Sequence, residues 1–579
     1  MNININNIVG NIRKAVNRVP DILSRRKYRI LWLAMFLFGI MSVVDLVMSD
    51  SLKFPLWLQI MYVIFFSSLK ATVMTLPLAW LMERGRWLKA LAWVVIVIYA
   101  LAASVNCFSL FFYGFGISRK LILIFMQTNF REASQFATGI WANIVSLAES
   151  PALYIVVIGI AGLYMLLTRC GRRVYLWITG ALSIAGVVAF GWYLVNFDWG
   201  RTAHSLAMRT VRYGREVQAW NRKFEELRTH KKPLLYAESA ISTHKAATVI
   251  FVIGESASSG HMQLYGYPLR TTPELCAAAD SLFIYRDAIS SASITAGSLE
   301  RMLSLKYDDD TSEDGLDFPL VVDIFKQAGY KIFWLSNQEI MGNFSNTSGV
   351  MVMNADEIEY VGADNSEDAL VQRFDEILMP PLYKALADTA TNKIIFLHLM
   401  GSHVAYNRRY PRDFDRIKGA DVQRALNHPW LDEKMAATVA QYDNSILYTD
   451  YLLSQIMAQV SARNDKALMI YLSDHGENVY DEGRSMGRGE KYVRVPMIVY
   501  PNRRYREEEP EMVERLRKSL SLPLSTANVE HQLMTLTGTQ YQLYDSTRDV
   551  LSPAFVRRHR YVNEHPWKYE TRKDGKTGK

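Results

Sequence analysis

Acidic and histidine side chains stand at the ends of several apolar, β-rich segments in the second half of the chain. These segments read ATVIFVIG, KIIFLHLMGS and ALMIYLS, and the residues that follow them are Glu255, His403, Asp474 and His475. Mixed oxygen and nitrogen ligands suit Zn²⁺ or Mn²⁺ better than Ca²⁺ or Mg²⁺, which prefer all-oxygen shells. If a hydroxyl joins them, the set predicts a site for one divalent cation.

Each of these signals is weak when it is taken alone. A single Asp or Glu at a strand end is commonly a helix N-cap or a surface charge, whereas Asp–His–Gly at a strand end is more specific. His398 alternates with apolar neighbours, which predicts a core position. We interpret His261 and His428 as structural or solvated residues. The acidic run at 308–310 is typical of a loop face.

The elements that must position the candidate ligands begin near residue 246. Short apolar segments alternate there with helix-like segments such as 319–328 and 436–461. Buried strands separated by helices predict an α/β domain with a mostly parallel sheet. Ligand sites in such sheets lie beyond the carboxyl ends of the strands. The residues at the strand ends are therefore expected to meet at one edge of the sheet.

The first third of the chain is apolar and predicts five transmembrane helices. Most of its apolar stretches reach the roughly 20 residues that cross a bilayer, and they cover residues 30–49, 57–80, 90–113, 151–167 and 174–195. Basic residues cluster before the first stretch and in alternate connections, which places the N-terminus in the cytoplasm. Everything after residue 198 is then expected outside, which in a bacterium means the periplasm.

The formal net charge of +8 is distributed unevenly. Residues 1–200 contain 18 Lys and Arg against 7 Asp and Glu, whereas the rest of the chain contains 47 against 50. The basic excess therefore belongs to the membrane-flanking segments and gives no argument for a nucleic-acid partner. The chain contains only three cysteines, which excludes a disulfide framework. We expect all three to be unpaired, namely Cys107, Cys170 and Cys276.

The same patterns predict the domain boundaries. We divide the chain into a basic cytoplasmic tail (1–29), a five-helix membrane domain (30–197) with an amphipathic outer loop (114–150), a bridging helix and linker (198–245), a catalytic domain (246–566) and a frayed tail (567–579). The bridging helix is expected over residues 205–231, where charged and apolar residues alternate. The outer loop is expected to lie on the membrane surface.

Five motifs give the chain a family resemblance. They read FVIGES (251–256), HMQLYGYPLRTTPEL (261–275), SITAGSLERML (293–303), FLHLMGSHVAYNRRYP (396–411) and YLSDHGENVYD (471–481). Together they resemble the bacterial phosphoethanolamine transferases of the alkaline-phosphatase superfamily. The resemblance covers nearly the whole chain, including the five spans. SNQ (336–338) and the late DSTRDVLSPAF (545–555) are most similar to the branch that modifies lipopolysaccharide core sugars.

The resemblance implies roles for particular residues. Thr295 matches the family nucleophile, and it completes a zinc site with Glu255, Asp474 and His475. His403 matches a histidine that binds substrate or a second zinc. Thr128 and Glu132 match positions near the lipid headgroup, and they lie four residues apart, so one helical face could present both.

The resemblance also implies the reaction and its location. Thr295 would take phosphoethanolamine from phosphatidylethanolamine, release diacylglycerol and pass the group to a lipopolysaccharide acceptor, either core heptose or lipid A. The enzyme would be a multi-pass protein of the bacterial inner membrane. Where many relatives have a later histidine, this chain has Arg484, Arg488 and Lys491. We therefore expect one zinc and not a second. Arg488 is a candidate for direct phosphate binding, and a solvated basic loop is the alternative.

Two other functions remain open at this point. A phosphoglycerol transferase of the lipoteichoic-acid type would resemble this chain in having five spans and a threonine nucleophile. A non-catalytic membrane scaffold or sensor is the alternative from a different class, although the intact set of site residues argues against it. A sulfatase activity is disfavoured because no Cys/Ser-x-Pro-x-Arg sequence occurs at the nucleophile position.

Overall fold

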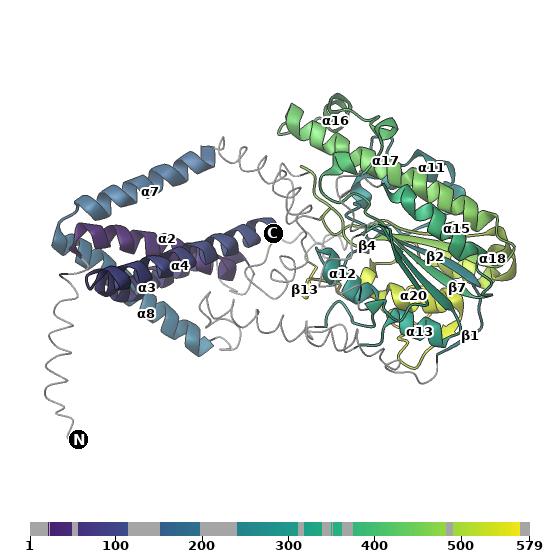
Figure 1. Cartoon of the computed structure of the whole chain (residues 1–579), viewed down its shortest axis with the longest axis horizontal. Helices are drawn as coiled ribbons and strands as arrows, with labels where there is room; N and C mark the ends of the chain where they lie inside the picture. Colours follow the sequence, from purple (N-terminus) through teal and green to yellow (C-terminus); the bar gives the residue numbers. More distant parts are fainter. Residues whose placement is uncertain are drawn as a thin grey trace, which may run out of the picture. The chain divides into compact units, whose positions relative to one another are not determined.

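The structure is a computed structural model, and it describes residues 21, 24–48, 56–113, 151–196, 240–310, 318–338, 349, 351–361, 374–481 and 490–567. Within the helices, no side chains are described at 42–48, 56–59, 107–113, 151–157 and 189–196. The chain forms two compact units, of which the second contains all described residues from Ala240 onwards (Figure 1). The expected bridging helix, the outer loop, Thr128, Glu132, Arg484 and Arg488 lie outside the described residues.

Five long helices make up the described part of the first unit. They are α2 (Arg26–Met48), α3 (Leu56–Met82), α4 (Arg86–Tyr113), α7 (Pro151–Arg169) and α8 (Arg172–Asn196). Each coincides with one of the five predicted apolar stretches. Among the described residues, 60–82 and 86–106 are long and apolar enough to cross a membrane, and 158–169 is a shorter apolar helix.

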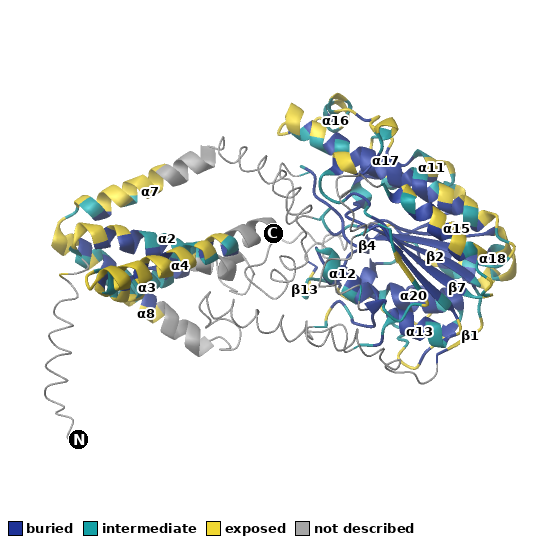
Figure 2. Cartoon of the chain, viewed as in Figure 1, coloured by how far each residue is buried: buried dark blue, intermediate teal, exposed yellow. Residues whose placement is uncertain are grey.

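The first unit exposes large apolar side chains and has polar links between its helices. Figure 2 shows many exposed residues along α4 and α7. Trp87 and Trp177 are 78% and 76% exposed. Inside, the Trp32 indole donates to the Thr72 hydroxyl at 2.9 Å, and that hydroxyl contacts Ser183 at 2.7 Å. In hydrocarbon, helices satisfy polar groups against one another and present apolar groups to lipid. This distribution is what a lipid-facing bundle requires.

The second unit is built on a seven-stranded sheet in the order β3-β9-β8-β2-β7-β5-β6. The strands are β2 (Thr248–Gly254), β3 (Phe283–Ile284), β5 (Lys331–Ser336), β6 (Glu357–Tyr360), β7 (Lys393–His398), β8 (Ala467–Ser473) and β9 (Met497–Pro501). The five strands from β8 to β6 are parallel, as predicted. The segment VPMIVYP forms β9, which runs antiparallel to β8, and β3 runs antiparallel to β9.

Helices cover both faces of this sheet. Figure 1 shows α15 (Met379–Ala387) and α17 (Glu433–Ser461) on one face, with α13 (Val321–Gln327) and α20 (Val529–Thr537) on the other. All seven residues of β2 and of β8 are buried. This burial explains why both strands read as continuous apolar runs, since a covered parallel sheet has no solvated face.

Two of our sequence interpretations need correction. We assigned Trp567 to a frayed tail, but its side chain is 5% exposed and packs with Ile289 and Val493. We interpreted residues 308–310 as a loop face. Asp309 is exposed in a turn, as expected, but Asp308 is 4% exposed and lies 3.5 Å from Arg548. The core position of His398 is confirmed. Burial lowers its pKa to about 4, and its ring packs against Trp334.

Candidate metal and nucleophile site

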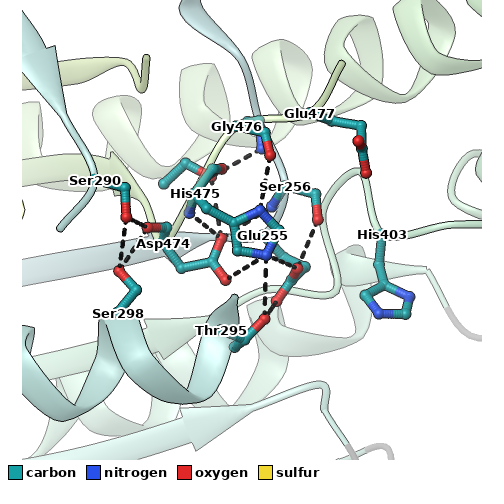
Figure 3. A network of polar contacts seen from close by, with 12 residues as sticks. Glu255, Ser256, Ser290, Thr295, Ser298, His403, Asp474, His475, Gly476 and Glu477 are labelled. Atoms are coloured by element: carbon teal, nitrogen blue, oxygen red, sulfur yellow. Dashed lines mark hydrogen bonds and ion pairs between the residues drawn. The ribbon is translucent and has the colours of Figure 1, made fainter. Parts of the chain in front are cut away.

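Two neighbouring strands bring the candidate metal ligands together. Glu255 directly follows β2, and Asp474 with His475 directly follows β8. Since β2 and β8 pair in parallel, with Gly254 opposite Ser473, their ends lie side by side. One ligand atom of each residue lies within 4.8 Å of the others, and all three residues are buried. Figure 3 shows the three side chains turned toward one another. Among the described residues, this is the only such group of three or more.

Asp474 uses its two carboxylate oxygens differently. Oδ1 accepts hydrogen bonds from the backbone N–H groups of Ser256, at 2.9 Å, and His475, at 2.6 Å. Oδ2 is buried without a hydrogen-bond partner and lies 3.4 Å from His475 Nε2. Burying an unbonded carboxylate oxygen is costly. A cation at this point would remove that cost, so the oxygen fits a metal ligand.

His475 is oriented in the same way. Its Nδ1 donates to the carbonyl of Gly476 at 2.7 Å, and its Nε2 faces the carboxylates of Glu255 and Asp474. A metal-binding histidine is commonly fixed by such a hydrogen bond. Burial alone would lower the pKa of His475, but Asp474 and Glu255 raise it to about 8. The two carboxylates therefore favour a positive charge at this position.

Glu255 connects the metal ligands to the predicted nucleophile. Its Oε1 accepts from the Ser256 hydroxyl at 2.7 Å. Its Oε2 accepts from the Thr295 hydroxyl at 3.1 Å and from Gln338 Nε2 at 3.0 Å. Gly401 (φ +48°) packs against the Glu255 backbone, where an added Cβ would come within 2.8 Å of the carbonyl oxygen. Glycine therefore lets this loop approach Glu255 closely.

Thr295 is the first residue of α12 (Thr295–Met302), and its Oγ1 lies 3.4 Å from His475 Nε2. The hydroxyls of Ser290 and Ser298 both donate to the carbonyl of Asp474 at 2.5 Å (Figure 3). They tie the start of this helix to a metal-ligand residue. N–H groups at a helix N-terminus also favour negative charge. The position therefore suits an alkoxide and a phosphoryl group.

His403 lies beside the metal ligands and outside their group (Figure 3). Burial lowers its pKa to about 4, although the Glu255 carboxylate acts in the opposite direction. Its backbone carbonyl accepts from Arg409 Nε at 2.9 Å. Glu477 is 4% exposed, and burial raises its pKa to about 7. Sequence reasoning did not single out Glu477.

Several other residues around the site received no role in the sequence analysis. Gln338 is the last residue of the SNQ motif, which begins at the end of β5, and its amide donates to Glu255 and to the carbonyl of Leu399, at 3.0 Å each. The signal for Gln338 was its position after a strand of the same sheet. Lys491, which the sequence analysis named together with Arg484 and Arg488, pairs with Asp481. Ser290 and Ser298 carry no sequence signal beyond their closeness to Thr295.

The donor set fits a metal ion and a reactive hydroxyl. Two carboxylates, one imidazole and one hydroxyl make an oxygen-rich, four-donor set of the kind that zinc accepts. The unbonded Oδ2 of Asp474 and the oriented Nε2 of His475 are both consistent with a cation between them. A cation there would lower the pKa of the Thr295 hydroxyl.

The sheet and the residues at its carboxyl edge define an alkaline-phosphatase-like α/β domain, and the chain also contains a separate helical unit. A family model described as Sulfatase matches residues 247–539, just over half of the chain, and the chain belongs to this family. The expected resemblance to bacterial phosphoethanolamine transferases is confirmed. Phosphoethanolamine transferase EptC of Escherichia coli K12 is 26% identical over 517 residues, which is 83% of this chain and 85% of that protein.

Solved structures show the same similarity. The C-terminal periplasmic domain of EptC from Escherichia coli, solved as a complex with Zn, is 27% identical with a TM-score of 0.50, over 57% of this chain and 92% of that one. The integral membrane protein lipooligosaccharide phosphoethanolamine transferase A from Neisseria meningitidis is 17% identical with a TM-score of 0.59. The match covers 90% of this chain and 97% of that one, and it shows a similar fold over this length.

Proposed function

We propose that this protein transfers phosphoethanolamine from phosphatidylethanolamine to a lipopolysaccharide acceptor through a phosphoethanolamine–Thr295 intermediate. The observation that carries this proposal is the position of the Thr295 hydroxyl, which contacts Glu255 Oε2 at 3.1 Å and His475 Nε2 at 3.4 Å. The similarity to named phosphoethanolamine transferases over more than four fifths of the chain supports the substrate class.

Thr295, Glu255 and the N-terminus of α12 have different roles in the first step. Thr295 Oγ1 attacks the phosphorus of the donor, and the proton of the Thr295 hydroxyl moves toward Glu255 Oε2, which accepts its hydrogen bond. The bond from phosphorus to the diacylglycerol oxygen breaks, and that oxygen departs with a proton as diacylglycerol. N–H groups at the start of α12 favour the charge on the phosphoryl oxygens.

The second step reverses the first with another alcohol or phosphate. An acceptor oxygen attacks the phosphorus of phosphoethanolamine–Thr295, and the bond to Thr295 Oγ1 breaks. The hydroxyl then regains a proton, and the enzyme is restored. A relative from Salmonella typhimurium is named a Kdo(2)-lipid A phosphoethanolamine 7''-transferase. We include both core heptose and lipid A as acceptors for this protein.

The metal ion in this proposal is one zinc held by Glu255, Asp474, His475 and Thr295. It would lower the pKa of the Thr295 hydroxyl and neutralise charge on the phosphoryl group. The zinc complex of the EptC domain supports this choice, as does the buried, unbonded Oδ2 of Asp474. We propose substrate-binding roles for His403, Thr128, Glu132 and Arg488.

We further propose that the five helices α2, α3, α4, α7 and α8 cross the bacterial inner membrane. The N-terminus would lie in the cytoplasm, and the domain from about residue 246 would lie in the periplasm. Basic residues before α2 and in alternate connections support this orientation. A reporter active only in the periplasm, fused after residue 567, should report activity. The same reporter at residue 84 should not, and the reverse pattern would contradict the topology.

Turnover of labelled lipid tests the activity. Purified protein in detergent is incubated with fluorescent phosphatidylethanolamine, and diacylglycerol release is compared between wild type and Thr295→Ala. We expect release from wild type alone. Equal release from both proteins would contradict the role of Thr295. Release only from phosphatidylglycerol would contradict the donor and favour a phosphoglycerol transferase.

A further inference from the structure

A short hairpin near the end of the described chain contains two strained residues. Strands β12 (Tyr561–Val562) and β13 (His565–Pro566) pair antiparallel, with Val562 opposite His565. Asn563 and Glu564 form the turn between them with φ values of +51° and +67°. A two-residue turn of this kind favours Asn followed by Gly. Glutamate at the second position is strained, because its Cβ crowds the backbone in the left-handed region, and such strain tends to persist where a function requires it.

Asn563 holds the segment that leads to Thr295. Its backbone N–H donates to the carbonyl of Ser291 at 2.9 Å. Its side-chain Nδ2 donates to the Ser293 hydroxyl at 2.8 Å, and its Oδ1 accepts from the Ser293 N–H at 3.2 Å. Both Nδ2 and Oδ1 of Asn563 therefore form hydrogen bonds with Ser293, which lies two residues before the predicted nucleophile.

Glu564 holds the helix that begins at Thr295. Its carboxylate accepts from Arg301 Nη2 at 2.9 Å, and the Arg301 side chain is fully buried on α12. Arg301 also donates to the carbonyl of Gly297 at 3.2 Å, within the same helix. The two turn residues thus contact the chain before Thr295, at Ser293, and after Thr295, at Arg301.

The base of the hairpin is itself fixed to the domain. The N–H of Tyr561 donates to Asp308 at 3.1 Å, and Trp567 packs with Ile289 and Val493. In Figure 1, β13 lies next to α12. A rigidly anchored turn can restrict the movement of the segment that it contacts, whereas a free terminus could not.

We infer that Asn563 and Glu564 are positioning residues for the Thr295 nucleophile. They hold α12 and the residues before it from one side, while Ser290 and Ser298 hold them through the Asp474 carbonyl. Displacement of a reacting group by about 1 Å can cost a hundredfold in rate. This inference rests on the proposed role of Thr295, and the two residues act on it through Ser293 and Arg301.

The variant Asn563→Gly tests the inference with little disturbance of the turn. Glycine adopts a φ of +51° without strain and keeps the N–H to Ser291, but it removes both side-chain contacts with Ser293. We expect the rate of phosphoethanolamine–Thr295 formation to fall at least tenfold. The KM for phosphatidylethanolamine and the zinc content should stay at wild-type values. Hydrogen exchange of the backbone amides at 293–299 should become faster without substrate.

The matched control is Asn427→Gly. Asn427 follows α16 (Gly419–Leu426) and has a φ of +48°, so this variant makes the same chemical change at a left-handed residue away from Thr295. It should retain the wild-type rate and exchange. Ser293→Ala removes the partner of Nδ2 without touching the turn, and it should lower the rate in the same direction. Asn563→Asp keeps the acceptor for the Ser293 N–H and should fall between wild type and Asn563→Gly.

Three outcomes separate the possibilities. Wild-type rates in Asn563→Gly, or in Ser293→Ala if the glycine variant does not fold, would overturn the inference. A lower rate accompanied by equal loss of zinc would also overturn it, because the hairpin would then act on the metal site as a whole. If wild type forms no intermediate, the proposed function fails. The hydrogen exchange at 293–299 then still decides whether Asn563 restrains this segment.

Discussion

The Thr295 hydroxyl donates to Glu255 Oε2 over 3.1 Å and joins the start of α12 to the end of β2 across 40 residues of sequence. The same carboxylate lies 3.5 Å from His475 Nε2 through its other oxygen. Glu255 therefore lies between the group that would attack the phosphorus and the groups that would hold the metal. A change at any of these residues is expected to affect both metal binding and the nucleophile.

The variant Asp474→Asn should remove the metal without unfolding the protein. The amide oxygen can still accept from the N–H groups of Ser256 and His475, but the amide nitrogen would replace the unbonded Oδ2 and cannot bind a cation. We expect zinc content near zero and a loss of activity of at least about a hundredfold. Elemental analysis of the purified variant measures the zinc content.

The control for this variant is Asp450→Asn. Asp450 is also buried, but it accepts from the N–H groups of Glu274 and Leu275 and does not belong to the ligand group. It should lower the melting temperature and leave the zinc content unchanged. Full zinc occupancy in Asp474→Asn would contradict the ligand assignment.

Chelation of the wild-type protein should abolish turnover, and added zinc should restore it. The described residues contain one group of three clustered ligands, so restoration is expected at about one zinc per chain. Titration of the metal-free protein with zinc, followed by activity and elemental analysis, gives this number. A clear requirement for two ions per chain would contradict the expectation of a single site.

The variant Gly401→Ala should weaken zinc binding through the backbone of Glu255. The new Cβ would lie 2.8 Å from the Glu255 carbonyl oxygen and would also occupy a left-handed conformation. Gly266 is the matched control, since it has a φ of +100° with no atom within 4 Å of an added Cβ. Gly266→Ala should lower the free energy of unfolding through backbone strain alone, by about 1–2 kcal/mol. Equal zinc affinity in both variants would contradict the role of the close approach.

His261 should stabilise the protein in a pH-dependent manner. It is buried, and its ring lies 2.7 Å from Asp443 and 3.2 Å from Asp481. Burial alone would lower its pKa, but these carboxylates raise it to about 9. Tyr267 and Tyr442 also pack against the ring. Because the folded pKa lies above the ordinary value, the stabilisation is complete below pH ~6.5 and disappears as the pH rises through about 9.

Thermal unfolding of wild type and His261→Gln between pH 6 and 9.5 measures this effect. The difference between the two proteins should be largest at the acid end and should shrink by roughly 3 kcal/mol towards the alkaline end. His428→Gln is the control, since His428 is partly exposed and stacks on Trp430. A constant difference between wild type and His261→Gln would show that His261 does not change its charge in this range.

The metal-ligand positions could be predicted from the sequence because these residues directly follow buried strands. The apolar runs before Glu255 and Asp474 are long enough to identify buried strands, and parallel strands place their carboxyl ends at one edge. The burial of both strands in the sheet agrees with this reasoning. The antiparallel direction of β9 was not predictable in the same way, since a short apolar strand has the same composition in either direction.

The contacts that support the site could not be predicted from local patterns. Asn563 and Ser293 are 270 residues apart, and nothing in the sequence near either residue indicates the other. Asp308 is buried next to Arg548, which is also far away along the chain. The unbonded oxygen of Asp474 follows from which N–H groups reach its other oxygen, and this is a property of the folded loops alone.

Mapping of the covalent intermediate tests the central claim most directly. Wild-type protein, incubated with phosphatidylethanolamine and no acceptor, is digested and analysed by mass spectrometry of the peptide that contains residues 293–301. We expect phosphoethanolamine on Thr295, in an amount equal to the diacylglycerol released, and its loss when lipopolysaccharide is added. Diacylglycerol release without any modified Thr295, or modification of a different residue, would contradict the mechanism.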